Sequence, residues 1–149
     1  RTIELLTPLA AKKQVALKAE GVSTTALVDP NQIQQVFANL VVNAIHASHA
    51  RGNVDVTVSE ETARPPVEIG GHEIDCVRVR VHDCGAGIAA EDISRVFEPF
   101  FTTKDVGEGT GLGLAVAYGI VRDHGGWIDV VSEKESGTEF SIFLKKTAE

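Results

Sequence analysis

Strand-like alternation in this chain comes in pairs, and a helical pattern stands before each pair. The helical patterns cover residues 3–12, 30–50 and 112–124, and the strand patterns cover residues 15–19, 24–28, 54–58, 76–81, 127–131 and 138–144. Strands this close in sequence favour hairpins, and helices placed between the pairs have to cover a face of the sheet. The chain therefore predicts a two-layer α/β sandwich, in which about three helices cover one face of a mixed, mostly antiparallel sheet.

The clearest single element is the helix that begins at Asp29-Pro30. Asp29 is a favourable N-cap, and proline suits the first helical position. We expect the helix to run to about Ala50, with Gly52 ending it. Apolar residues recur along it at helical spacing: Ile33, Val36, Phe37, Leu40, Val41, Ala44 and Ile45.

Composition fits a single domain over residues 1–149, with 43% hydrophobic and 23% charged residues. The net charge of −7 argues against nucleic acid or an anionic membrane as a partner, because both need a basic face. No apolar run approaches the ~20 residues that span a bilayer, and no signal peptide is recognisable, so we expect no direct membrane insertion.

Two cysteines, Cys76 and Cys84, are too few for a disulfide framework and lack metal-binding spacing. Reduced thiols, and hence a cytoplasmic location, are the expectation. Methionine is absent even at position 1. We therefore expect a fragment of a longer protein, and the parent protein can still be membrane-anchored.

A polar stripe follows the long helix. Asn39 and Asn43 are four residues apart and project from one face, and His46 continues that face one turn later. Alone, two asparagines on a helix surface are the more common explanation. Polar groups on an otherwise buried helix need partners, however, and carboxamide oxygens suit Mg²⁺ that also shares phosphate oxygens.

A carboxylate and two glycines end the valine-rich strand: Asp83, Gly85 and Gly87. The carboxylate can accept a hydrogen bond from an exocyclic amine, and glycines let a flat base approach the backbone. An ordinary turn is the alternative, since Asp-x-Gly is common there. Thr138 could place its hydroxyl beside the same base, although a plain strand start is the more common explanation for that segment.

Residues 85–111 contain few regular patterns and many glycines, and a loop this long is usually functional or disordered. Its last glycines, from Gly107 to Gly113, match neither the P-loop nor G-x-G-x-x-G. They lead into a helix start, where backbone N–H groups attract phosphates; a flexible linker is the alternative. Phe97, Phe100 and Phe101 fit either a small hydrophobic core or a lid with Lys104 reaching a phosphate.

These segments, in this order, resemble the N, G1, F and G2 boxes of the catalytic ATP-binding domain of sensor histidine kinases. The boxes are Asn39-Leu-Val-Val-Asn43-Ala-Ile-His46-Ala47, Asp83-Cys-Gly85-Ala-Gly87-Ile88, Phe97-Glu-Pro-Phe100-Phe101-Thr-Thr-Lys104 and Gly107-Glu-Gly109-Thr-Gly111-Leu-Gly113-Leu114. The resemblance spans about residues 2–145 and includes the closing His124-Gly-Gly and Gly137-Thr-x-Phe elements. It implies the Bergerat fold of the GHKL superfamily, with a long ATP lid at about residues 89–111.

The resemblance also implies roles for individual residues, with ATP and Mg²⁺ as cofactors. Asn43 would coordinate Mg²⁺ with Asn39 assisting, and these two are the catalytic candidates. Asp83 would hold the adenine amine, and Thr138 would support the base. The other cofactor-binding candidates are His46, Ala47, Gly85, Gly87, Ile88, Thr102, Thr103, Lys104, Gly109, Thr110, Gly111, Leu112 and Gly113.

One position discriminates within the superfamily. Its hydrolysing ATPases carry a glutamate general base four residues before the metal-binding asparagine, and here that position is Asn39. Without a base, attack by water is slow, which favours a kinase that transfers the γ-phosphoryl group to a histidine. The alternatives are a nucleotide-binding signalling module without transfer and a dimerising GHKL ATPase.

The resemblance further implies a separate acceptor domain. In such kinases the acceptor histidine lies on a helical dimerisation domain, in a His-Glu/Asp pattern. His46, His49 and His124 are not followed by an acidic residue, and His72, which precedes Glu73, lies in the Gly70-Gly71 loop. The chain alone should therefore lack autophosphorylation, and the implied partners are the dimerisation and histidine phosphotransfer domain of the parent protein and, indirectly, a response regulator.

Overall fold

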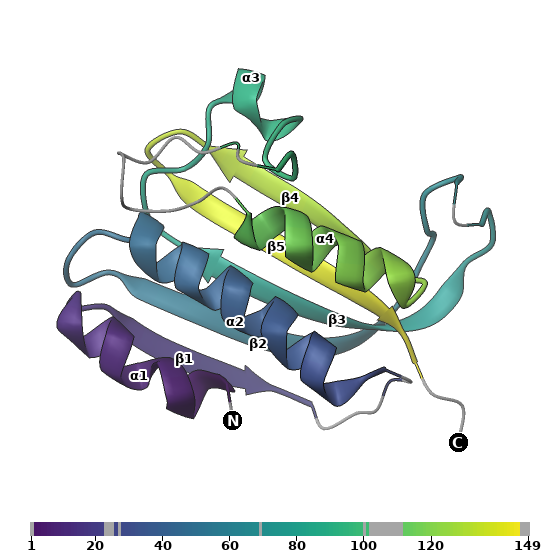
Figure 1. The fold of residues 1–149 in the computed structure, drawn as a ribbon, viewed down its shortest axis with the longest axis horizontal. Coiled ribbons are helices and arrows are strands. Elements are labelled where there is room, and N and C mark those ends of the chain that lie inside the picture. The colour runs from purple at the N-terminus through teal and green to yellow at the C-terminus, as the bar shows by residue number, and fades with distance from the viewer. Residues whose placement is uncertain are drawn as a thin grey trace.

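The computed structural model describes residues 2–22, 26, 28–68, 70–99, 101 and 112–146. At its centre is a five-stranded sheet in the order β1-β2-β3-β5-β4 (Figure 1). The strands are β1 (Ala16–Gly21), β2 (Asn53–Ala63), β3 (Ile74–Asp83), β4 (Trp127–Glu133) and β5 (Gly137–Lys145). β1 runs parallel to β2 and the other neighbours are antiparallel, so the sheet is mixed and mostly antiparallel, as predicted.

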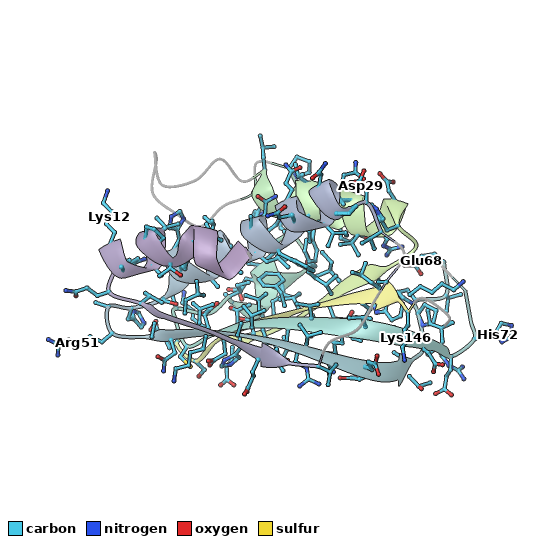
Figure 2. The ribbon with its side chains drawn as sticks, turned by 90° about the horizontal axis from the view of Figure 1, so that it is seen from below. Lys12, Asp29, Arg51, Glu68, His72 and Lys146 are labelled. Carbon is cyan, nitrogen blue, oxygen red and sulfur yellow. The ribbon has the colours of Figure 1, made fainter. Side chains whose placement is uncertain are left out.

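Three helices form a second layer on one face of the sheet (Figure 2): α1 (Thr2–Lys12), α2 (Pro30–Ala47) and α4 (Gly113–Asp123). A short fourth helix, α3 (Ala90–Ile93), contacts β4. The core lies between the layers, where Leu40, Val81, Val121 and Phe140 are almost completely buried. This arrangement confirms the predicted fold class. Within the described ranges, no helix is both long and apolar enough to cross a membrane.

The long helix α2 begins as predicted and ends earlier. Asp29 caps it by accepting hydrogen bonds from two first-turn N–H groups at 3.0 and 3.4 Å. The prediction of an end near Ala50 at Gly52 is wrong, because the helix ends at Ala47 and Ser48 adopts an extended conformation. Ser48 still donates its N–H and its hydroxyl to carbonyl groups of the last turn, and these bonds close the helix without a glycine.

Two strand predictions also need correction. Of the candidate strand 24–28, Ala26 makes only an isolated bridge to Lys146, and residues 24, 25 and 27 lie outside the described residues. The β2–β3 ladder is longer than the apolar alternation indicated, so the predicted loop 60–73 begins only after Ala63. Glu61 pairs with Arg78 and Arg80 across this ladder at 3.2 and 2.9 Å, and such polar cross-strand pairs extend a sheet that apolar periodicity does not reveal.

Candidate nucleotide-binding site

The candidate site lies at one end of the sandwich, where several elements start or stop. β3 ends at Asp83, β5 begins beside it at Gly137, and α2 ends at Ala47. Pairing in the sheet places Thr138 between Asp83 on β3 and Ser132 on β4. Figure 1 shows these ends on the same side of the molecule as the start of α4. The fold thus gathers residues from distant parts of the sequence.

Asp83 is a buried carboxylate, with 1% of its surface exposed. Its Oδ1 accepts the N–H of Gly85 at 2.9 Å. Burial raises the pKa of Asp83 above its ordinary value, and the N–H groups of Gly85 and Thr138 offset part of this rise. A buried carboxylate is stabilised by further hydrogen-bond donors, and the exocyclic amine of a base would supply one.

Close backbone packing accounts for the two glycines after Asp83. A Cβ on Gly85 would lie 2.0 Å from the carbonyl oxygen of Ala47 at the end of α2. Gly87 has a φ of +71, and its Cβ would lie 2.1 Å from the carbonyl oxygen of Glu133. Both positions therefore require glycine because the loop is packed between α2 and β4. That these glycines also contact a base stays a prediction.

Ser132 is a site residue that sequence reasoning missed. Its Oγ accepts the N–H of Ile88 at 2.8 Å and lies 2.7 Å from Thr138 Oγ1 and 2.9 Å from the carbonyl oxygen of Gly137. All three bonds form together when Ser132 donates to Gly137 and Thr138 donates to Ser132. Thr138, which is 4% exposed, then keeps its lone pairs as acceptors. The register that puts Ser132 opposite Thr138 could have revealed it.

The polar stripe of α2 is divided between two environments. Asn39 and Asn43 are half-buried, whereas His46 is exposed. Asn39 Nδ2 donates to the carbonyl oxygen of Gly113, the first residue of α4, at 3.1 Å. At the end of the stripe, the carbonyl of Ala47 accepts the N–H of Ala86 at 3.2 Å. The stripe therefore faces both the start of α4 and the loop after β3.

The start of α4 offers backbone N–H groups. Leu112 is its N-cap residue, and the leucine side chain makes no capping hydrogen bond. The first bond across this turn is from Val116 N–H to the carbonyl of Leu112 at 2.9 Å. Helix starts of this kind favour anionic groups through their N–H groups and the helix dipole. Leu112 and Gly113 are exposed.

The segment before α4 is described only in part. Phe97 packs against Tyr118 and Phe140, with ring centroids 5.0 and 6.1 Å apart, and Arg95 lies over the ring of Phe101 at 4.6 Å. Both phenylalanines contact the main core, which agrees with the core alternative, and closure of the segment over ATP stays a prediction. The other predicted residues of this segment lie outside the described residues: Phe100, Thr102, Thr103, Lys104, Gly109, Thr110 and Gly111.

The described residues fit a purine nucleotide with its phosphates. Asp83 and Thr138 provide buried acceptors at the ends of two interior strands, and the start of α4 provides donors for phosphate oxygens. Asn43, half-buried on α2, offers the hard amide oxygen that Mg²⁺ prefers. These residues are thus suitable for both a nucleotide and Mg²⁺.

Comparison with known proteins identifies the family. Residues 28–148 match the family of histidine kinase-, DNA gyrase B-, and HSP90-like ATPases. Sensor histidine kinase ZraS from Escherichia coli (strain K12) is 37% identical over 145 residues, which are 96% of this chain and 28% of ZraS. The chain also spans only 13% of the sensor kinase CckA from Brucella abortus (strain 2308), so it corresponds to a small part of these relatives.

Solved structures of histidine kinases are similar to this chain in fold. The nucleotide-free catalytic domain of histidine kinase ThkA superposes with a TM-score of 0.79 at 31% identity, covering 98% of this chain and 88% of that domain. ThkA in complex with the response regulator protein TrrA gives a TM-score of 0.73 at 30% identity, covering 98% of this chain and 38% of that chain. Full-length ShkA in complex with AMPPNP gives a TM-score of 0.76 at 28% identity, covering 99% of this chain and 29% of that one. This chain therefore belongs to the histidine kinase-, DNA gyrase B-, and HSP90-like ATPase family, as a catalytic domain of the sensor histidine kinase type.

Proposed function

We propose that this domain binds Mg-ATP at the end of the sandwich formed by β3, β5, α2 and α4. Asp83 would accept the adenine amine, and Thr138 would support the base. Asn43 would coordinate Mg²⁺, which when bound neutralises phosphate charge. The observation that carries the proposal is the burial of the Asp83 carboxylate beside Gly85 and Thr138, because a buried carboxylate at the end of a strand is suited to a base amine.

The reaction we propose is transfer of the γ-phosphoryl group to a histidine on a separate dimerisation and phosphotransfer domain. An imidazole nitrogen of that histidine forms the new P–N bond, the bond from the γ-phosphorus to the bridging oxygen breaks, and ADP leaves. This chain would position ATP and neutralise its charge, which is most of what phosphoryl transfer requires. The response regulator would then be an indirect partner, as the ThkA–TrrA complex suggests by analogy.

The residue at position 39 supports transfer to histidine over hydrolysis. Residue 39, at the position of the glutamate base in the hydrolysing ATPases, is an asparagine, and its Nδ2 donates to the carbonyl of Gly113. An amide in this arrangement cannot take a proton from water at neutral pH. A slow ATPase activity is therefore expected from the chain on its own.

The experiment has two parts. First, AMPPNP is titrated into the chain with and without Mg²⁺, and we expect Mg²⁺ to tighten binding. Second, the chain is mixed with ATP and the separately produced dimerisation domain of the parent protein, and acid-labile, base-stable phosphorylation of that domain is measured. Binding without phosphorylation would contradict the transferase proposal and leave a nucleotide-binding signalling module, whereas absence of binding would overturn the site itself.

A further inference from the structure

Helix α4 is attached to α2 by a polar contact at each end. At its C-terminal end, His124 Nε2 accepts the N–H of Asp29 at 3.1 Å, and Nδ1 lies 2.8 Å from the carbonyl of Ile120. At its N-terminal end, Asn39 Nδ2 donates to the carbonyl of Gly113 at 3.1 Å. The two helices are therefore antiparallel, with α2 and α4 in contact between the two bonds.

The two hydrogen bonds to α2 lie a full helix length apart, one at each end of α4. The helix has 11 residues, from Gly113 to Asp123, and thus a length of about 16 Å at ~1.5 Å per residue. One contact is made at its first residue and the other at the residue after its last. Since Ala117 and Val121, between them, are completely buried, rotation and sliding of α4 on α2 are both opposed.

The hydrogen bond to Gly113 identifies which side-chain atom of Asn39 faces α4. A carbonyl oxygen only accepts, so the atom of Asn39 that faces it is the amide nitrogen. The carbonyl of Gly113 has a second lone pair for the helix bond from Ala117 N–H. Asn39 thus adds a bond to the first turn without displacing one, and an aspartate or glutamate at this position would have no N–H to donate.

We infer that Asn39 is a positioning residue, which fixes the first turn of α4 against α2 through the carbonyl of Gly113. The expected consequence, which rests on the proposed function, is that the N–H groups at the start of α4 are held at a constant place relative to Asn43. This role differs from that of a second metal ligand, because it depends on the amide nitrogen and operates without Mg²⁺ or nucleotide.

Two substitutions separate these roles. Asn39→Asp keeps an oxygen at the same place, which suits Mg²⁺, but removes the donor. Asn39→Leu has a similar shape and removes both the oxygen and the N–H donor, without adding charge. Gln35→Glu is the control for charge, since Gln35 is an exposed residue on the same helix.

The readout is amide hydrogen exchange of the chain without nucleotide or Mg²⁺. We expect both Asn39 variants to exchange roughly 3- to 10-fold faster at Val116 and Ala117, as loss of one hydrogen bond implies. The amide of Val79, within the sheet core, should exchange at the unchanged rate and shows that the variants are folded. Gln35→Glu should behave as the unmodified chain. Unchanged exchange at Val116 and Ala117 in both Asn39 variants would overturn the inference.

Binding gives an independent second readout. If Asn39 positions α4, Asn39→Asp weakens ADP binding by a similar factor with and without Mg²⁺. If it acts mainly as a metal ligand, Asn39→Asp keeps or strengthens Mg²⁺-dependent binding, and the inference fails. Should the unmodified chain bind no nucleotide, the proposed function fails, while the exchange measurement still decides the role of Asn39.

Discussion

Asp83→Asn should remove most nucleotide affinity. The Oδ1 of Asp83 already accepts the N–H of Gly85. An asparagine that keeps this bond turns its NH₂ group toward the base amine, and one that flips turns NH₂ toward Gly85, so a donor faces a donor either way. A hydrogen bond to a charged group contributes about 1.5–3 kcal/mol, which predicts a roughly 10- to 150-fold rise in the dissociation constant of AMPPNP.

The same substitution should leave the fold as stable as before or more stable. Because burial raises the folded-state pKa of Asp83 above its ordinary value of 3.8, the folded state binds the proton more tightly than the unfolded chain. The free energy of unfolding should therefore fall as the pH rises from 3.8 through the raised pKa, and Asp83→Asn should lack this fall. AMPPNP affinity should rise over the same interval, since only the ionised carboxylate accepts freely from the amine.

Isothermal titration calorimetry with AMPPNP and thermal unfolding, both repeated across that pH interval, test these two effects on one protein. Asp129→Asn is the matched control, because it removes the same charge from an exposed position on β4. Loss of affinity together with an unchanged or higher melting temperature supports the site. Affinity within threefold of the unmodified chain would refute the assignment of Asp83 to the base, and a large loss of stability would refute the reasoning about its burial.

Four further substitutions have expected outcomes. Asn43→Ala should lower AMPPNP affinity in Mg²⁺ to the Mg²⁺-free level; a Mg²⁺ effect that survives would rule it out as the ligand. Gly85→Ala should destabilise the fold by more than ~3 kcal/mol in urea unfolding, because of its clash with α2. Gly119→Ala, in open space on α4, should instead stabilise by about 0.5–1 kcal/mol, and equal effects of the two alanines would contradict the packing argument. Ser132→Ala should lower the free energy of unfolding by roughly 1–3 kcal/mol, because Ile88 N–H loses its acceptor; no loss would mean that water replaces the hydroxyl.

Local patterns in the chain were sufficient for the fold class and for most elements. Asp29 and Pro30 start α2 as expected, because an N-cap bond and a fixed φ depend on neighbouring residues only. Strand alternation identified β3 and the last two strands for the same reason, because a half-buried strand alternates apolar and polar residues along the sequence. The end of α2 was misplaced because Ser48, not a glycine, closes it.

The family assignment was also available from the sequence. It depends on the order and spacing of four segments, and the comparisons agree with it over residues 28–148. The roles of individual site residues stay predictions, which the binding experiments above address. The candidate site residues between 102 and 111 lie outside the described residues.

Only the tertiary structure could decide the contacts between distant segments. Ser132 looked like any strand residue until the register of β4 and β5 placed it beside Thr138. The sequence placed Asn39 only on the polar stripe of α2, and the packing of α4 puts the carbonyl of Gly113 against its amide nitrogen. That Asn39 also assists Mg²⁺ stays a prediction. The physical reason is that periodicity and capping are local, whereas the partner of a hydroxyl or an amide depends on which chain segment the core brings to it.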